Sequence, residues 1–303
     1  MNPKTLLLSC IFILSPVIAH AGNCGVLETT KSSVSTRIEF ESISRPGCYK
    51  AQGDLVNLQP EIVEYRPSES DMLALFSGEV KIDLDGKRMI GRRGATGGII
   101  AVMRRRYGGV EILNGTIEST DRPAIALLQA DGGEMYSQLS DFDQSDPERA
   151  KAAWAHFQRF QSRRSASFAD TANRLKGLEL KSTAAQYVVG IQGGKNIVIR
   201  NTIIAVNSTV GLYIFGPDNV IENNTIIFES YDGDSVSAAP IKLYHADRSV
   251  LRNNKIIIKR GKGGVDAAIS ILQSKDIVLE NNTVSGVDRE FKLWDAESSV
   301  KRP

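Results

Sequence analysis

The C-terminal half of the chain alternates short runs of β-branched residues with asparagine. Four segments align with one another: they start at Asn196, Asn219, Ser249 and Asp276 and read NIVIRNTII, NVIENNTII, SVLRNNKII and DIVLENNTV. Their matching valines, at 198, 220, 250 and 278, are 22, 30 and 28 residues apart. A repeat of this length is typical of a solenoid. The short Val/Ile runs predict strands, and asparagine tolerates the left-handed backbone of a tight corner.

A further apolar run precedes each of these segments, starting at Tyr187, Gly211, Ile241 and Ile269. Each coil therefore contributes at least two strands, which should pair in parallel with the strands of the next coil. The same pattern occurs earlier in the chain, in runs that start at Lys81, Gly98, Val110 and Ile125. A leucine-rich repeat is the alternative solenoid, but it requires regularly spaced leucines and usually a helix in each unit.

The segments RPGCYKAQGDL from Arg45, IDLDGKRMIG from Ile82 and VEILNGTI from Val110, followed by the Asn-Asn repeats, resemble the pectin-lyase-like superfamily. The resemblance implies an all-β fold, a right-handed parallel β-helix. It also implies a family rich in polysaccharide lyases, hydrolases, epimerases and carbohydrate-binding modules, which includes proteins without known catalysis. The catalytic motifs of the β-helix polygalacturonases are missing, because the chain has no Asp-Asp and no Gly-His-Gly.

The N-terminal residues predict export. Residues 1–21 read as a signal peptide, with Lys4 ahead of an apolar run and a small-x-small cleavage site at Ala19-His20-Ala21. Two cysteines remain after cleavage, Cys24 and Cys48, and such a pair predicts a disulfide in an oxidising compartment. We therefore expect a secreted or periplasmic protein, a monomer, without a membrane-spanning segment.

The remaining domain boundaries follow from the repeats. Residues 22–71 should form an N-terminal cap stapled by the disulfide, and residues 72–303 the β-helix, because a solenoid needs protected ends. Residues 137–180 interrupt the repeat. Asp146-Pro147-Glu148 is typical of a helix start, and a second helix is predicted from Ser165 to Lys176, ending at Gly177. This helical insertion either packs on the solenoid or forms a wall beside a binding groove.

The most varied chemistry falls in one coil. A net charge of +2 argues against nucleic acid as a partner, and an acidic polysaccharide fits the fold better. A uronate lyase or epimerase must neutralise a carboxylate and remove the adjacent carbon-bound proton. The side chains suited to these steps gather at Lys242, Tyr244, His245 and Arg248. Alternation predicts that Lys242 and Tyr244 point outward, with Leu212, Ile214, Ser270 and Leu272 as the equivalent positions of neighbouring coils. An ordinary solvated face is the structural alternative.

Other residues are candidates for binding. Tyr231 and Asp247 flank the varied coil, and Arg104 and Arg106 belong to a basic turn that suits an acidic glycan. No cofactor is required, but Asp232 and Asp234 offer oxygens to calcium. Trp294 is a candidate for stacking on a sugar, although packing over the core of the last coil is the interpretation we favour. Two hypotheses follow: an enzyme acting on acidic polysaccharide, or a non-catalytic β-helix that binds in the envelope.

Overall fold

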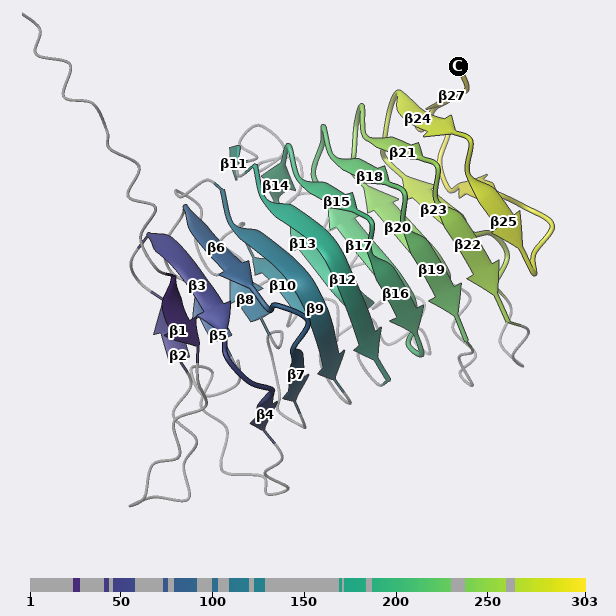
Figure 1. Cartoon of the computed structure of the whole chain (residues 1–303). Coiled ribbons are helices and arrows are strands. Elements are labelled where there is room, and N and C mark those ends of the chain that lie inside the picture. The colour runs from purple at the N-terminus through teal and green to yellow at the C-terminus, as the bar shows by residue number, and fades with distance from the viewer. Residues whose placement is uncertain are drawn as a thin grey trace, which may run out of the picture.

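The computed structural model describes residues 24–27, 41–43, 46–57, 73–75, 79–91, 100–102, 109–119, 123–128, 169–170, 172–183, 187–229, 238–259 and 265–303. Within these ranges every regular element is a strand, which confirms the all-β class. The strands stack coil upon coil from the N-terminal to the C-terminal end (Figure 1). No helix long and apolar enough to cross a membrane occurs among the described residues.

Each complete coil has three sides, and strands on one side pair in parallel with the next coil. The first side consists of β1 (Gly25–Leu27), β3 (Gly47–Ala51), β6 (Val80–Asp83), β9 (Glu111–Ser119), β12 (Arg174–Ser182), β15 (Val198–Arg200), β18 (Val220–Glu222), β21 (Val250–Arg252), β24 (Ile277–Glu280) and β27 (Val300–Lys301). The second side consists of β4 (Leu55–Asn57), β7 (Arg88–Gly91), β16 (Ile203–Val206), β19 (Thr225–Phe228), β22 (Lys255–Ile258) and β25 (Thr283–Ser285), with the ends of β9 and β12.

The third side is a separate sheet of nine strands. It consists of β2 (Glu41–Ile43), β5 (Leu73–Leu75), β8 (Ile100–Val102), β10 (Ile125–Leu128), β13 (Tyr187–Gln192), β17 (Val210–Phe215), β20 (Ala239–Tyr244), β23 (Ile269–Leu272) and β26 (Phe291–Leu293). A small pair of strands, β11 (Ala169–Asp170) and β14 (Gly194–Lys195), stands apart from both sheets.

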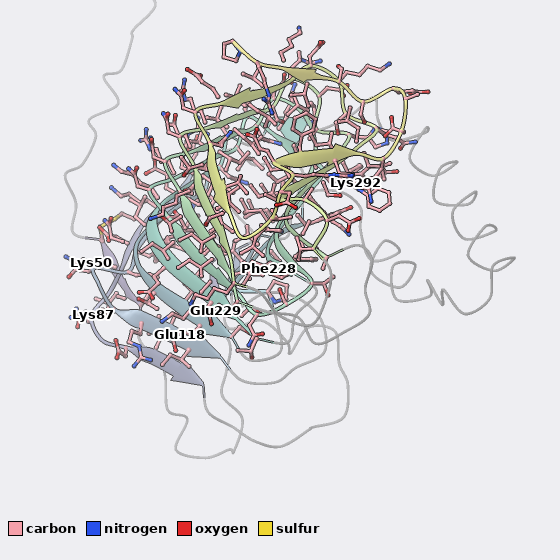
Figure 2. All side chains as sticks on the ribbon, turned by 90° about the vertical axis from the view of Figure 1, so that its right-hand side faces the viewer. Lys50, Lys87, Glu118, Phe228, Glu229 and Lys292 are labelled. Carbon is pink, nitrogen blue, oxygen red and sulfur yellow. A yellow bond between two sulfur atoms is a disulfide. The ribbon has the colours of Figure 1, made fainter. Side chains whose placement is uncertain are left out.

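The alignment of repeats predicted from the sequence matches the register in which strands of neighbouring coils pair. Val198 lies opposite Val220, Val220 opposite Val250, and Val250 opposite Val278. The residues that follow each of these valines, such as Ile199, point inward and are fully buried. Period-two alternation therefore puts one apolar row per strand into a continuous core, which fills the space between the sheets (Figure 2).

The Asn-Asn pairs form the corner between the first and second sides. The first asparagine of each pair has the expected left-handed backbone, with φ of 56° at Asn223 and 54° at Asn253. The second points inward and joins a ladder: the backbone N–H of Asn224 donates to Oδ1 of Asn254 at 3.1 Å, and that of Asn254 donates to Oδ1 of Asn282 at 3.1 Å. Buried amides thus bond from coil to coil, where an unpaired polar group would be costly.

The helix predicted from Ser165 to Lys176 is wrong over its described part. Residues 169–170 belong to β11, and β12 runs through Gly177 to Ser182. Gly177 does take a positive φ, 64°, but as the corner of a coil and not as a helix end. The reason is pairing with strands on both sides: β12 lies between β9 and the pair β15 and β16 and buries Leu175 and Leu180. The rest of the proposed insertion, 137–168, lies outside the described residues.

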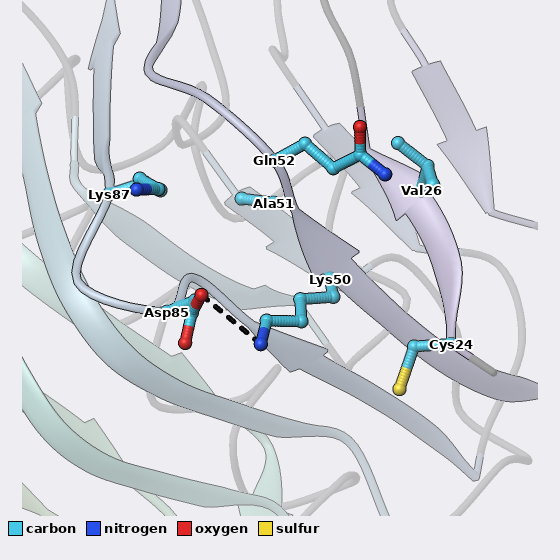
Figure 3. A pocket seen from close by; sticks show the side chains of 7 residues that line it. All are labelled: Cys24, Val26, Lys50, Ala51, Gln52, Asp85 and Lys87. Atoms are coloured by element: carbon cyan, nitrogen blue, oxygen red, sulfur yellow. Dashed lines mark ion pairs between the residues drawn. The ribbon is translucent and has the colours of Figure 1, made fainter.

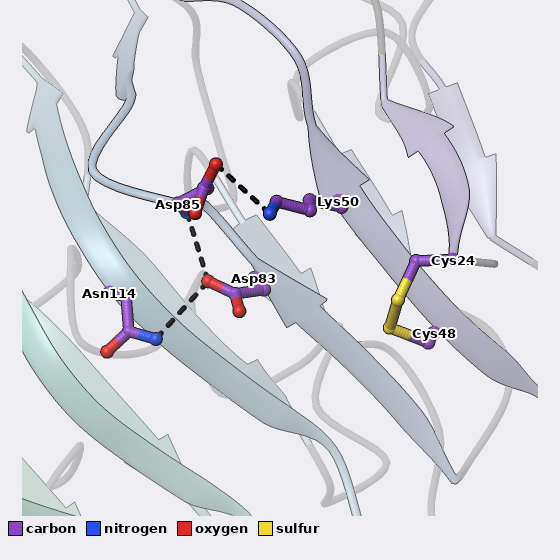
Figure 4. The surroundings of a disulfide bond; sticks show 6 residues. All are labelled: Cys24, Cys48, Lys50, Asp83, Asp85 and Asn114. Atoms are coloured by element: carbon purple, nitrogen blue, oxygen red, sulfur yellow. Dashed lines mark hydrogen bonds and ion pairs between the residues drawn. A yellow bond between two sulfur atoms is a disulfide. The ribbon is translucent and has the colours of Figure 1, made fainter. Parts of the chain in front are cut away.

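The predicted disulfide between Cys24 and Cys48 is present (Figure 4). It connects the start of β1 to β3, whose strands already pair in parallel through Gly25 and Tyr49. β3 in turn pairs with β6. The strands of residues 24–57 therefore belong to the same stack as the coils that follow, and the boundary expected near residue 71 does not interrupt the order of the sheet. The signal peptide lies outside the described residues.

Candidate functional site

The outer face of the nine-stranded sheet carries the candidate site. In neighbouring coils Tyr213 of β17 lies opposite Lys242 of β20, and Lys242 lies opposite Ser270 of β23. Ser270 lies opposite Lys292 of β26, on the outside of the last coil (Figure 2). These four residues form one row that crosses the strands, and because strands are about 4.8 Å apart, adjacent side chains of the row are close neighbours.

The register corrects one predicted face. Leu212 and Ile214 were expected to point outward, but both are fully buried in the core. Leu212 lies opposite Ile241, so the outward residues of β17 are Tyr213 and Phe215. A shift of the register by one residue exchanges the inward and outward faces of a strand. The residues at the start of β17 did not indicate which of its side chains point inward. The inward direction of Ile241 and the outward direction of Lys242 are confirmed.

Lys242 is half-buried on this face and has no acidic partner among the described residues. Within the described part of the chain, no carboxylate forms an ion pair with its ammonium group, and burial is the cause that lowers its pKa to about 8. Lys292, two strands away, differs: its Nζ lies 2.7 Å from Oδ2 of Asp266. Removing a cation from water without a counter-charge favours its neutral form. Lys242 is thus a cation without a counter-ion among the described residues.

Two tyrosines lie on the side of Lys242 that faces the earlier coils, Tyr213 directly opposite it and Tyr187 beyond. The ring of Tyr187 covers Gly190, where an added Cβ would lie 2.2 Å from that ring. The rings of Tyr187 and Tyr213 are stacked, with centroids 5.9 Å apart. Burial raises the pKa of the Tyr213 hydroxyl, so this group keeps its proton at physiological pH. The stacked pair of rings thus lies in the coils before Lys242.

A second row lies beside the first. Phe215 and Tyr244 are in contact, with ring centroids 5.5 Å apart, and both are buried although they face away from the core. Burial is also the main reason why the pKa of Tyr244 is raised. Tyr244 therefore presents a protonated phenol next to Lys242 on the same strand.

His245 follows directly and ends β20 with a positive φ of 46°. Its ring centroid lies 4.5 Å from that of Tyr244, and its side chain is hydrogen-bonded to Gln273. Burial outweighs the nearby carboxylates and lowers the pKa of the imidazole, so the ring is neutral at physiological pH. Among the described residues, Nε2 of His245 is buried and has no hydrogen-bond partner.

Trp294 bounds the site on the last coil. Its indole N–H donates a short hydrogen bond to Oγ of Ser270, and Nζ of Lys292 lies 3.9 Å from the centre of its ring. The interpretation that Trp294 covers the core of the last coil is wrong, because 45 % of the residue is exposed. Contacts with Ser270 and Lys292 hold the indole beside the row.

Arg248 and Asp247 do not join this group. Both lie at the corner after β20, where the Arg248 guanidinium pairs with Asp218 through Nε–Oδ1 and Nη2–Oδ2 contacts of 2.7 and 2.8 Å. This carboxylate raises the pKa of Arg248 further. Asp247 accepts a hydrogen bond from the backbone N–H of Lys275 at 2.7 Å. Both residues therefore connect coils, which is a structural role.

The other predicted site residues lie outside the described residues: Arg104, Arg106, Tyr231, Asp232 and Asp234. They stay predictions, and so does calcium binding. Among the residues that the structure describes, no group of three or more His, Cys, Asp or Glu side chains could hold a metal ion. The residues that the sequence reasoning missed are Tyr213 and Lys292, while Ser270 was predicted only as an outward position; aligning the inward apolar positions of consecutive coils would have revealed their common row.

A shallow depression of about 550 Å³ lies at the other end of the stack (Figure 3). It is lined by Cys24, Val26, Lys50, Ala51, Gln52, Asp85 and Lys87. Lys50 is neutralised by Asp85 at 3.1 Å, and Asp83 nearby accepts hydrogen bonds from the Asp85 backbone and the Asn114 amide (Figure 4). These are exposed polar contacts, so the outer face around Lys242 is the stronger candidate.

Parallel coils with asparagine corners define the chain as a β-solenoid. Comparison with protein families gives the same result: residues 167–293 match the family described as "Right handed beta helix region". The chain is thus a right-handed parallel β-helix repeat protein. Neither the curated proteins nor the solved structures gave a match. The match covers the coils that carry Lys242, Tyr244 and His245.

Proposed function

We propose that this protein binds acidic polysaccharide on the outer face of the nine-stranded sheet, with Lys242 as the carboxylate-binding residue. One observation carries the proposal: Lys242 is a half-buried cation between Tyr213 and Ser270, and no carboxylate of the described residues forms an ion pair with it. A carboxylate of the ligand would supply the missing charge, and a charge-assisted hydrogen bond to it would be strong in this partly dry setting.

The surroundings of Lys242 suit a sugar polymer. Tyr213 on one side and the half-exposed Trp294 on the other offer ring faces on which the apolar face of a sugar packs. Ser270, between Lys242 and Lys292, is held as the acceptor of the Trp294 indole. A chain lying across the strands would therefore meet an aromatic, a cationic and a second aromatic position in succession.

Binding is tested with the purified protein and uronate polymers such as pectate, alginate and hyaluronan, by isothermal titration calorimetry. We expect Lys242→Met to weaken binding about tenfold or more, because it removes a charge from a desolvated contact. Lys255→Met is the matched control, since Lys255 is exposed on the second side of the coil. Equal affinities of wild type and Lys242→Met would refute the proposal.

A catalytic extension is supported by the same strand. The neutral His245 is able to accept a proton near neutral pH, while Lys242 holds the carboxylate as a cation and Tyr244 keeps its own proton. These roles suit β-elimination or epimerisation of a uronate; we leave Arg248 out of the proposal because it pairs with Asp218. Ultraviolet absorbance of unsaturated products, measured with and without calcium, tests elimination, and solvent deuterium incorporation tests epimerisation. Binding without either signal would favour the non-catalytic β-helix.

Export forms part of the proposal. The disulfide between Cys24 and Cys48 supports it, because structural disulfides persist mainly outside the reducing cytoplasm. Cell fractionation followed by detection of the protein under non-reducing conditions tests this placement. Recovery of the protein with reduced cysteines from the cytoplasmic fraction would count against it.

A further inference from the structure

The outward residues of the first side form rows that run along the stack of coils. Each strand there pairs in register with the next, so equivalent residues of β15, β18, β21 and β24 lie about 4.8 Å apart (Figure 1). A strip of half-buried apolar surface thus lies next to a regular alternation of positive and negative charge. The apolar row consists of Val198, Val220, Val250 and Val278. The charged row beside it consists of Arg200, Glu222, Arg252 and Glu280.

The two inner members of the charged row pair within the chain, and the two outer members do not. Nη2 of Arg252 lies 2.6 Å from Oε2 of Glu222. Arg200 and Glu280 form no ion pair with any residue that the structure describes, and the other neighbour of Arg200 in the row is a second cation, Lys176. Arg200 and Glu280 are three strand spacings apart, about 14 Å, so they cannot pair within one molecule.

This order of charges is complementary to itself when it is reversed. Two copies can lie face to face about a two-fold axis that is parallel to the strands, so that their stacks run in opposite directions. Arg200 of one copy then meets Glu280 of the second copy. Glu222 meets Arg252 in the same way, and the valine row of one copy covers that of the other. All four charges of the row would therefore find an opposite charge across the interface.

Other arrangements bring like charges together. A two-fold axis along the stack would place each residue of the charged row opposite its own copy. A shift of the antiparallel pair by one coil would place Arg200 opposite Arg252, and Glu222 opposite Glu222. Like charges that face each other across an interface are unfavourable, so the pattern selects one orientation and one register.

We propose that the valine row and the charged row join two copies of this chain as an antiparallel dimer, in place of the monomer expected from the sequence. The register places Arg174 before the valine row and Lys301 after it. Both are bonded within their own chain: Arg174 donates to the carbonyl of Asn196 at 2.7 Å, and Lys301 pairs with Asp276 at 2.9 Å. The apolar contact therefore spans four coils, about 19 Å along the stack, which suits a weak dimer.

The dimer does not depend on polysaccharide binding. Its interface lies on the first side of the coils, whereas Lys242 lies on the nine-stranded sheet of the third side. Uronate binding and dimer formation can therefore fail separately.

Sedimentation velocity of the purified protein, over concentrations up to the millimolar range, measures the dimer. We expect Arg200→Glu and Glu280→Arg each to raise the dissociation constant about tenfold or more, because each places like charges opposite one another in the dimer. The double variant should restore the affinity of the wild type. Lys255→Glu is the matched control: it reverses an exposed charge on the second side and should leave the dissociation constant unchanged.

Restoration by the double variant separates contact between copies from effects within one chain, since Arg200 and Glu280 are too far apart in one molecule to compensate each other. Circular dichroism verifies that each variant is folded. Added salt should also weaken the dimer of the wild type, a test that needs no variant. A wild type that stays monomeric at every concentration would overturn the proposal. So would a dimer that salt or the single variants leave unchanged, or a double variant no tighter than the single ones.

Discussion

The asparagine ladder gives the sharpest test of what holds the coils together, and Asn254 is its best-connected member. Its Nδ2 donates to the carbonyl of Ile221 and to Oδ1 of Asn282, each at 2.9 Å. Its Oδ1 accepts from the backbone N–H and from Nδ2 of Asn224, at 3.1 and 3.0 Å. The residue is 1 % exposed, so water cannot replace these partners.

Replacing Asn254 by alanine removes all four of these side-chain hydrogen bonds. Each is a neutral bond worth about 1 kcal/mol net, and the buried groups left behind lose their partners. We therefore expect Asn254→Ala to lower the free energy of unfolding by about 4 kcal/mol. Hydrogen bonds are lost in three successive coils, since Asn224 and Asn282 belong to the coils on either side of Asn254.

The neighbouring Asn253 is the control. It is exposed and takes a φ of 54°, so Asn253→Ala loses only the tolerance of asparagine for the left-handed backbone, about 1 kcal/mol. Urea unfolding followed by circular dichroism measures both variants. If Asn254→Ala costs no more than Asn253→Ala, the ladder is not a source of stability and the reasoning is refuted.

Three further predictions follow from the structure. The pKa of Lys242 falls from 10.5 in the unfolded chain to about 8, so the unfolded chain binds more protons between these values. The free energy of unfolding should therefore rise with pH through this window in wild type relative to Lys242→Met, whereas uronate binding should weaken; parallel pH profiles of the two proteins would contradict this. Gly286→Ala should cost more than about 1 kcal/mol, because the new Cβ would lie 1.8 Å from the carbonyl oxygen of Ile258 at a φ of 90°; the open Gly53→Ala should be neutral in the same thermal unfolding assay. Reduction of the Cys24–Cys48 disulfide should lower the free energy of unfolding by about 3 kcal/mol, which denaturation with and without dithiothreitol measures, and no loss would mean that the first coil is held by its strands alone.

The sequence by itself determined the repeat, its corners and the disulfide. The repeats could be aligned at Val198, Val220, Val250 and Val278 because each coil has the same local sequence pattern. A β-branched run forms the strand, and a residue that accepts a positive φ follows it at the corner. Cys24 and Cys48 could be paired because only two cysteines remain beyond the predicted signal peptide. Such features depend on neighbours in the chain, which the sequence shows directly.

Only the tertiary structure decided which residues accompany Lys242. Tyr213 and Ser270 come beside it through the register of three coils that are 28 to 30 residues apart at their corners, and a slip of one residue would have reversed the face of β17. The same holds for β12, where pairing on both sides produced a strand from a segment with helical spacing. Arg248 does not accompany Lys242, because its guanidinium pairs with Asp218 of the preceding coil. Contacts between coils, and not local preference, thus decide which groups of the outer face are free to meet a ligand.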